Sequence, residues 1–137
     1  MGYRGPNVTM GYAECREDLI KGDEWHGEIL TGDMARRDCD GMYYIIGRKS
    51  RFLKLYGHRV NLDRCEGLVR EAFEGECACV GNDDKMIVYT TGAQCVEKIP
   101  GFLSKKTGIY HAAFEARFID AIPRNEAGKV LYSKLGE

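Results

Sequence analysis

Among the charged residues that directly follow glycines, three lie in short motifs suited to binding or catalysis. They are Asp33 in LTGD, Arg48 in IGRKS and Lys129 in IPRNEAGKVL. An aspartate in a tight turn either bonds its own backbone or accepts hydrogen bonds from the vicinal hydroxyls of a ribose. Arg48 lies in either a polar linker or a hinge whose arginine reaches a nucleotide. Lys129, in a turn with Pro, Asn and Gly, is either a solvated surface charge, as most lysines are, or a side chain held out for a function.

A fourth feature is the segment KLYGHRV, which predicts a hairpin tip carrying Gly57, His58 and Arg59. On its own this tip is equally well explained as a solvated turn. No phosphate-binding P-loop and no dinucleotide-binding glycine motif occurs in the sequence. The six cysteines are scattered without a C-x-x-C pair, so we predict no metal site and buried, reduced thiols.

Composition limits the classes of protein and partner. Of 137 residues, 44% are hydrophobic and 30% are charged, and the net charge is -1. These values predict a globular protein and argue against a nucleic-acid partner, which usually requires a basic surface. The sequence has neither an apolar run of about 20 residues nor a signal-peptide core, so we predict no membrane span. With the reduced cysteines, this indicates a cytoplasmic protein.

The residues after position 50 follow a regular order of elements. Alternation and helical periodicity predict an α+β domain in which helices cover one or both faces of a small sheet. In this arrangement we expect Glu66 on a helix face, with Arg59 and Arg64 as candidate partners. The expected elements are a hairpin at 51–60, a helix from 61 or 62 to Gly75, strands at 76–80 and 86–91, a helix at 95–106, a strand at 114–121 and a short helix from 131.

The first third of the chain lacks a helix that could cover its strands. We expect a short helix at 14–21 and strands at 28–31, 34–37 and 42–46, with Gly32-Asp33 in a turn. A few strands with open edges are marginal by themselves. The segment therefore indicates part of a larger structure, or a homodimer formed through residues 1–47.

Taken together, the order and spacing of the motifs resemble the C-terminal end of the adenylate-forming enzyme superfamily. This superfamily includes AMP-forming acyl-CoA synthetases, adenylation domains of nonribosomal peptide synthetases, D-alanine ligases and luciferases. The resemblance covers essentially all of the chain, but only the last part of the family's usual length. It rests on GPNV with Gly11-Tyr12, TGD at 31–33, Asp40-Gly41, YIIGR at 44–48, Lys54, GHRV at 57–60, Glu66, and PRN at 123–125 with Gly128-Lys129.

The resemblance implies a division into domains. Residues 1–47 would be the tail of a distorted β-barrel in the N-terminal domain, 48–50 a hinge, and 51–137 a small mobile C-terminal domain. Asp33 would bind the ribose of ATP or AMP, and Arg48 would also contact the nucleotide. Ser50 occupies the hinge position, where the family usually has Asp or Lys.

The resemblance also assigns the remaining motifs. Lys129 matches the catalytic lysine, which stabilises the approach of a carboxylate to the α-phosphate of ATP. Gly57, His58 and Arg59 would face the pantetheine tunnel during thioester formation, so CoA or a carrier protein is an implied partner. Mg²⁺ would accompany ATP, and its ligands would lie in the absent N-terminal adenylation domain. The site for the carboxylic or amino acid substrate would lie in the same domain. The alternative is a stand-alone, non-catalytic module that binds CoA, a carrier protein or a truncated partner.

Overall fold

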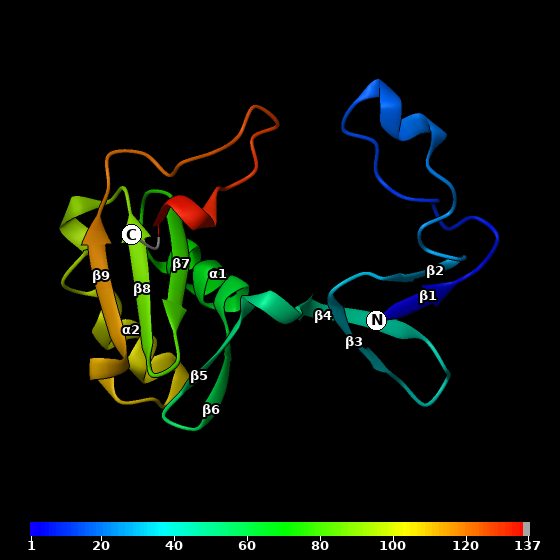
Figure 1. The fold of residues 1–137 in the computed structure, drawn as a ribbon. Helices are drawn as coiled ribbons and strands as arrows, with labels where there is room; N and C mark the ends of the chain where they lie inside the picture. Colours follow the sequence, from blue (N-terminus) through cyan, green and yellow to red (C-terminus); the bar gives the residue numbers. More distant parts are fainter. Residues whose placement is uncertain (136–137) are drawn as a thin grey trace. The chain divides into compact units, whose positions relative to one another are not determined.

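The computed structural model describes residues 1–135, which form two compact units (Figure 1). The first unit is Met1–Ser50 and the second begins at Arg51. A 3-10 turn, η2 (Lys49–Arg51), contains this boundary. Within the described residues, no helix combines the length and apolar character needed to cross a membrane.

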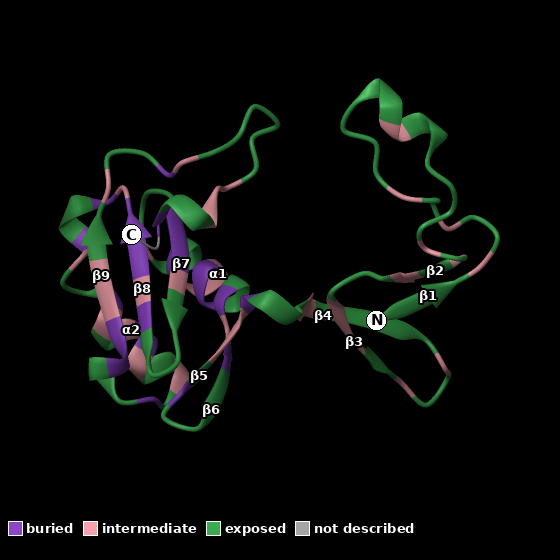
Figure 2. Cartoon of the chain, viewed as in Figure 1, coloured by how far each residue is buried: buried purple, intermediate pink, exposed green. Residues whose placement is uncertain are grey.

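The first unit contains two separate antiparallel ribbons. Strand β1 (Gly2–Arg4) pairs with β2 (Glu28–Leu30), and β3 (Asp33–Arg37) pairs with β4 (Tyr43–Arg48). The helix expected at 14–21 is only the 3-10 turn η1 (Arg16–Ile20). Not one of the first 50 residues is buried, as the absence of purple in this unit of Figure 2 shows.

The second unit is built on a three-stranded sheet in the order β7-β8-β9. The first two strands are antiparallel, whereas β9 runs parallel to β8 because a helical crossover separates them. The hairpin of β5 (Phe52–Leu55) and β6 (His58–Asn61) precedes the sheet. The other elements are β7 (Cys77–Asn82), β8 (Lys85–Thr90), β9 (Phe114–Phe118), α1 (Leu62–Ala72), α2 (Ile99–Thr107), and the 3-10 turns η3 (Ala93–Cys95), η4 (His111–Ala113) and η5 (Tyr132–Leu135).

Alternation along the strands covers both faces of this sheet. Side chains such as Cys79 and Val88 point toward α1 and α2 and join the larger core cluster. Their neighbours Ala78 and Tyr89 point to the opposite face, where they pack with Ile122 and other residues of the C-terminal segment. Because alternate residues of a strand face opposite sides, one short sheet supports both cores.

The two α-helices begin for different local reasons. The side-chain oxygen of Asn61 accepts a hydrogen bond from the Arg64 amide at 3.2 Å and so caps α1. Pro100 lies in the first turn of α2, where its missing N–H costs little. The single helix expected at 95–106 was wrong, because the chain before Pro100 forms the separate turn η3.

The predicted α+β class is confirmed, as is the order of elements from residue 51 to β9. The short helix expected from residue 131 is the 3-10 turn η5. Asp33 is also placed differently from the expectation, since it is the first residue of β3 rather than part of a turn. Residues 136–137 of the predicted C-terminal domain lie outside the described residues.

Candidate functional site

Asp33 and Arg48, the two predicted nucleotide ligands, lie opposite each other on β3 and β4. The Arg48 Nε is 3.8 Å from the Asp33 Oδ1, with the arginine side chain 75% exposed and the aspartate 23% exposed. The Asp33 amide donates to the Thr31 hydroxyl at 3.2 Å, which fixes the start of the strand. The structure therefore brings together a carboxylate and a guanidinium that have 14 residues between them in the sequence.

Ser50, the predicted hinge residue, is exposed and lies within η2. The division between the two units falls directly after it. Before it, the Lys49 amide donates to the Gly32 carbonyl at 2.8 Å, so the first unit is hydrogen-bonded up to Lys49. Rotation about Ser50 stays a prediction.

Lys129 lies at the end of a tight, closed turn. The Asn125 amide donates to the Lys129 carbonyl, and the Lys129 amide donates to the Asn125 Oδ1, each at 2.9 Å. The Gly128 amide donates to the Asn125 carbonyl, also at 2.9 Å. Gly128 has φ 74°, a left-handed conformation that most other residues adopt only with strain. Asn125 and Gly128 thus determine where the lysine backbone lies.

The base of this turn is attached to the second unit. The Arg124 guanidinium donates to the Gly128 carbonyl at 2.8 Å and to the Glu76 carboxylate at 3.0 Å. The Leu131 amide donates to the Pro123 carbonyl at 2.8 Å. We refer to residues 123–131 as the Lys129 hairpin. On either side of it the chain is anchored by buried Ile122 and Leu135.

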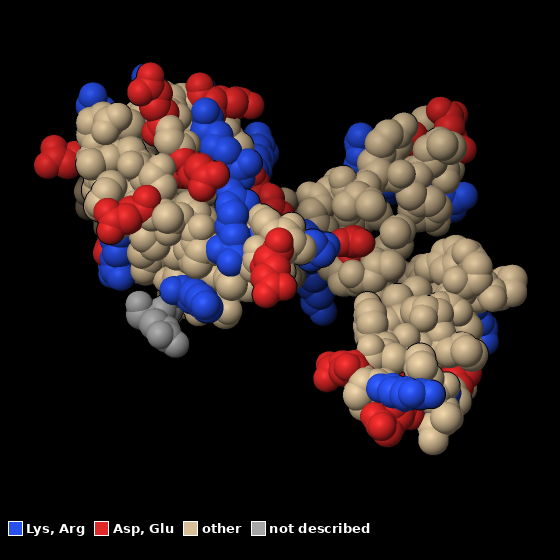
Figure 3. Space-filling model, turned by 90° about the horizontal axis from the view of Figure 1, so that it is seen from above, with Lys and Arg blue, Asp and Glu red and all other residues tan. Residues whose placement is uncertain are grey.

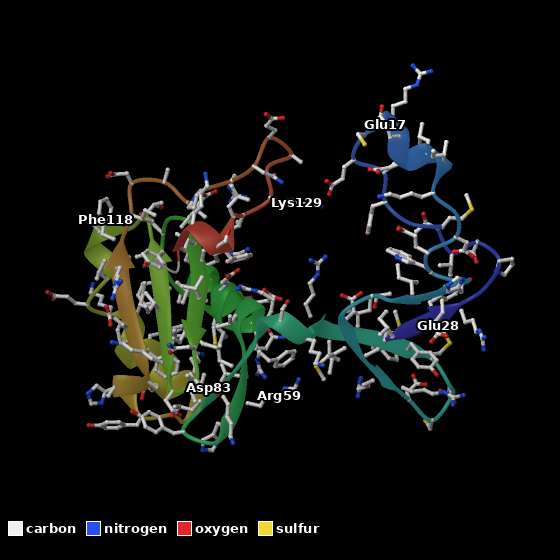
Figure 4. The ribbon with its side chains drawn as sticks, in the orientation of Figure 1. Glu17, Glu28, Arg59, Asp83, Phe118 and Lys129 are labelled. Atoms are coloured by element: carbon white, nitrogen blue, oxygen red, sulfur yellow. The ribbon has the colours of Figure 1, made fainter. Side chains whose placement is uncertain are left out.

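The Lys129 side chain is exposed, and its ammonium makes no hydrogen bond or ion pair with any residue in the described part of the chain (Figure 4). It therefore keeps its full capacity to bind an anion. The hydrogen bonds of the hairpin at this point involve the Lys129 amide and the Gly128 carbonyl, not the ammonium.

The other predicted tip, at Gly57, is also well defined. Tyr56 and Gly57 both have positive φ, 46° and 84°, as the two central residues of a two-residue hairpin turn require. The Asp84 carboxylate accepts from the Tyr56 amide at 2.9 Å and thereby holds the tip beside the β7–β8 turn. His58 and Arg59 are exposed, and the Arg59 guanidinium lies 4.4 Å above the Phe52 ring.

The Lys129 hairpin and the Gly57 tip lie at opposite ends of β7. Arg124 reaches Glu76, just before the strand, whereas Asp84 holds the Gly57 tip just after it. Figure 4 shows the same separation between Lys129 and Arg59 within this unit. The 6 residues of β7 span about 17 Å. One orientation of the unit therefore cannot present both features to the same point.

Glu66 lies on a face of α1 as predicted, but this face is buried and the glutamate side chain is only 3% exposed. It forms ion pairs with Arg51 and Arg70, and its Oε2 accepts a hydrogen bond from the Tyr132 hydroxyl at 3.3 Å. The spacing could have revealed this burial, because Glu66 follows Leu62 by four residues and so lies on the apolar stripe of α1. The spacing of four residues also identifies Arg70 as a partner, whereas no local signal identifies Arg51 or Tyr132, which come from distant segments.

Four of the six cysteines, Cys65, Cys77, Cys79 and Cys95, line the same core. Burial raises the pKa of the Cys65 thiol to about 11, despite the opposing charge of Arg64. Burial also raises the pKa of Cys77 and, well above its ordinary value, that of Cys79. These thiols are therefore neutral at physiological pH. Across residues 1–135, no cluster of three or more His, Cys, Asp or Glu side chains is arranged to hold a metal ion.

Acidic and basic side chains are interspersed on the surface (Figure 3). In this view a run of blue groups crosses the second unit with red groups beside it, and neither unit shows a face of one sign only. The absence of a nucleic-acid partner stays a prediction from the near-neutral net charge. Anion binding would depend on local features such as Lys129.

Comparison with known proteins explains this combination of features. The chain is 31% identical to the 2-succinylbenzoate–CoA ligase of Bacillus cereus over 96% of its own length and 29% of that protein. A structure from studies of the fatty acyl-adenylate ligases of E. coli and L. pneumophila superimposes with a TM-score of 0.71 at 18% identity, covering 98% of this chain and 26% of that one. The relatives and structural neighbours of this chain are AMP-forming acyl-CoA ligases and other adenylating enzymes.

The chain matches the C-terminal portion of these relatives, as the motif order predicted. ATP-bound MatB from Rhodopseudomonas palustris has the same fold, with a TM-score of 0.56 and 20% identity over 80% of this chain and 24% of that one. No protein-family model matches the chain. It spans less than a third of the length of the curated relative described above.

Proposed function

We propose that this chain is the C-terminal part of an ATP-dependent, AMP-forming carboxylate ligase and that Lys129 is its catalytic lysine. The observation that carries the proposal is the presentation of Lys129: a closed hairpin fixes its backbone while its ammonium is exposed and unpaired within residues 1–135. A cation held in this way is suited to an anionic reaction centre outside its own unit.

The proposed reaction brings two anions together. A carboxylate oxygen attacks the α-phosphorus of ATP, an acyl-adenylate forms, and pyrophosphate leaves. The Lys129 ammonium would bridge carboxylate and phosphate oxygens and stabilise the charge that accumulates between them. Because the hairpin is closed by its own hydrogen bonds, we infer that Lys129 moves with the whole second unit rather than through unfolding of its loop.

Asp33 and Arg48 would contribute to the nucleotide site. The carboxylate would accept hydrogen bonds from the ribose hydroxyls of ATP or AMP, and Arg48 would contact the same nucleotide. Their ion pair is weak at 3.8 Å and exposed, so a ligand can replace it at little cost. Mg²⁺ would enter with ATP. We assign its ligands, and the carboxylic or amino acid site, to the portion of the relatives that precedes this chain.

A second half-reaction would use the other end of the second unit. After a rotation at the hinge near Ser50, the tip bearing Gly57, His58 and Arg59 would face CoA or a carrier-protein phosphopantetheine. The separation of this tip from Lys129 along β7 supports two orientations, since each half-reaction needs only one of the two features. A small polar residue such as Ser50 can absorb the required backbone change.

The exposed apolar residues of the first unit support the proposal that another protein surface covers this unit. Four consecutive β4 residues, Tyr43 to Ile46, are each at least 45% exposed. The chain corresponds to only 29% of its Bacillus relative, so we propose that the preceding portion of the ligase covers this ribbon. A homodimer through residues 1–47, or a stand-alone module that binds CoA or a carrier protein, would replace this proposal if the first portion showed no affinity for the chain.

We also propose a cytoplasmic location. Cys65, Cys77 and Cys79 are buried neutral thiols without disulfide partners, as is usual for proteins of a reducing compartment. Labelling of the protein in intact and fractionated cells would test this location, and export of the protein would contradict it.

The decisive experiment is carboxylate-dependent pyrophosphate exchange by the complete ligase. Lys129→Ala should lower exchange on the order of a hundredfold, as expected for loss of one preorganised charge donor. Lys105→Ala, at an exposed lysine in the last turn of α2, is the matched control and should leave exchange unchanged. Wild-type exchange by Lys129→Ala would refute the role of this lysine. The isolated chain should be inactive.

A further inference from the structure

The proposed function makes no use of Arg51, a buried charged residue at the start of the second unit. Its side chain is only 11% exposed, yet each part of the guanidinium has a partner. Its Nε donates to the Asp63 Oδ1 at 2.7 Å, its Nη1 to the Cys79 carbonyl at 2.8 Å, and its Nη2 to the Glu66 Oε1. The residue that follows the predicted hinge is therefore fixed to α1 and β7.

Glu66 completes the same arrangement from α1. Its Oε1 also accepts from the Cys79 amide at 2.8 Å, while its Oε2 accepts from Arg70 at 2.9 Å. Strand β7 pairs with β8 on one side only. Arg51 and Glu66 thus bind the carbonyl and amide of Cys79 at the free edge of β7, which would otherwise leave two backbone groups unsatisfied.

Tyr132 connects this buried ion pair to the Lys129 hairpin. Its ring lies over the Arg51 guanidinium, with the Cζ 3.8 Å from the ring centre, and its hydroxyl donates to the Glu66 Oε2 at 3.3 Å. Tyr132 directly follows Leu131, whose amide closes the hairpin at Pro123. A single ion pair is consequently in contact both with the start of the unit and with the end of the hairpin.

We propose that Arg51, Glu66 and Tyr132 form a positioning network that fixes the Lys129 hairpin relative to the residue at which the hinge ends. This inference rests on the proposed roles of Lys129 and of the hinge. If the Arg51 guanidinium left its place, the buried Glu66 Oε1 and the Cys79 carbonyl would each lose a charged partner, so the network behaves as one rigid unit. A backbone rotation before Arg51 then moves Lys129 together with Arg51, because the Lys129 hairpin does not change its position within the second unit.

The electrostatics of the network favour this rigidity. Burial by itself lowers the pKa of the Arg51 guanidinium, but the hydrogen bond to Asp63 and the charge of Glu66 outweigh burial and raise the pKa overall. Burial, together with the charge of Glu66, raises the pKa of Tyr132 above its ordinary value. Arg51 therefore stays charged and Tyr132 stays a hydrogen-bond donor throughout the physiological pH range.

Amide hydrogen exchange on the complete chain tests the network without requiring activity. In Tyr132→Ala, which removes both the ring and the hydroxyl, the amides of Lys129 and Leu131 should exchange about tenfold faster, as expected for loss of a hydrogen bond to a charged group. Tyr132→Phe, which keeps the ring over Arg51, should have a smaller effect. Tyr110→Ala is the control, because Tyr110 is 64% exposed and lies outside the network.

The pattern of exchange decides the outcome. Faster exchange confined to residues 123–131, with the β7 and β8 amides unchanged, supports positioning. Equal acceleration throughout the second unit would mean that Tyr132 only stabilises the fold, and unchanged exchange would mean that it does not hold the hairpin. Either result overturns the inference.

Kinetics of the complete ligase provide the second measurement. Tyr132→Ala should lower kcat for adenylation about tenfold or more with the KM for ATP unchanged, since the lysine is displaced while the nucleotide site is intact. Tyr132→Phe should recover part of the loss. If Lys129→Ala is inactive but Tyr132→Ala has wild-type kcat, the network is refuted and the proposed function stands. If Lys129→Ala is fully active, the proposed function fails instead.

Discussion

The two units of this chain differ in how far their apolar residues are buried. In Met1–Ser50 no residue is buried, and Tyr43 to Ile46 are exposed although they are strong strand formers. In the second unit, residues of the same kind, such as Val88 and Leu103, are completely buried. The difference lies in the number of layers, because the first unit has two-stranded ribbons and the second has a sheet covered on both faces.

This contrast indicates which unit can fold independently of another protein surface. A two-stranded ribbon has two faces and two edges but no second layer to bury them, so it is marginally stable in water. A sheet with helices on one face and the C-terminal segment on the other buries the apolar side chains of both faces within its own unit. We therefore expect the second unit to be autonomous and the first to depend on another protein surface. The predictions below test this difference, beginning with the largest effect.

Truncation of a core residue should have the largest effect, and only in the second unit. Leu103→Ala, at a position with 0% exposure, should lower the free energy of unfolding by about 2–5 kcal/mol because it leaves a cavity. Ile45→Ala, at a position 65% exposed, should change it by less than about 0.5 kcal/mol. Urea unfolding followed by circular dichroism measures both. Similar losses in the two variants would show that the units share one core.

Alkaline pH should also destabilise the second unit selectively. Burial raises the pKa of Cys65 from its ordinary 9.0 to about 11. Between these values the unfolded chain releases the proton while the native state keeps it, so the free energy of unfolding falls as pH rises. The fall should be about 3 kcal/mol for this thiol.

The measurement is the urea midpoint at several pH values from 8 to about 11 in the presence of a reductant. Cys65→Ala should flatten the pH dependence of the urea midpoint. Cys79 should account for part of the pH dependence that remains. Cys39→Ala is the control, because this cysteine is exposed in the first unit and should leave the curve unchanged. A curve that is equally steep with and without Cys65 would rule out its contribution.

Loss of the α1 cap should have an intermediate effect. Asn61→Ala removes the acceptor for the Arg64 amide and should lower the stability of the second unit by about 1 kcal/mol. Asn61→Asp keeps an acceptor at the same position and should retain most of the stability. Thermal unfolding of the two variants distinguishes them. An Asp variant as unstable as the Ala variant would show that capping is not what Asn61 contributes.

The smallest expected effect is a gain in stability. Gly67 lies inside α1, and a Cβ added there would meet no other atom within 4 Å. Gly67→Ala should therefore raise the free energy of unfolding by up to about 1 kcal/mol, because alanine favours the helix. Gly128 is equally uncrowded but has φ 74°, so Gly128→Ala should be destabilising. A loss of stability in Gly67→Ala would indicate that its surface is covered by another element.

The strand and helix pattern of the second unit was largely predictable because it depends on neighbouring residues. Alternation identified β7 and β8, and the stripe through Leu62, Cys65 and Val69 identified α1. Boundaries were less accurate where a local effect intervened, as at Pro100, which separated η3 from α2. The exposed first unit was also anticipated, because no helix was available to cover its strands.

By itself, the sequence determined the order of the elements, the resemblance to the C-terminal portion of adenylating enzymes, and the residue types at each motif, including Lys129, Asp33 and Arg48. Those features depend on local spacing, which a single chain displays directly. Only the tertiary structure decided that Glu66 is buried with Arg51 and Tyr132, and that Lys129 and the Gly57 tip occupy opposite ends of β7. Burial and ion pairing join residues that are far apart in sequence, and no local pattern specifies such partners.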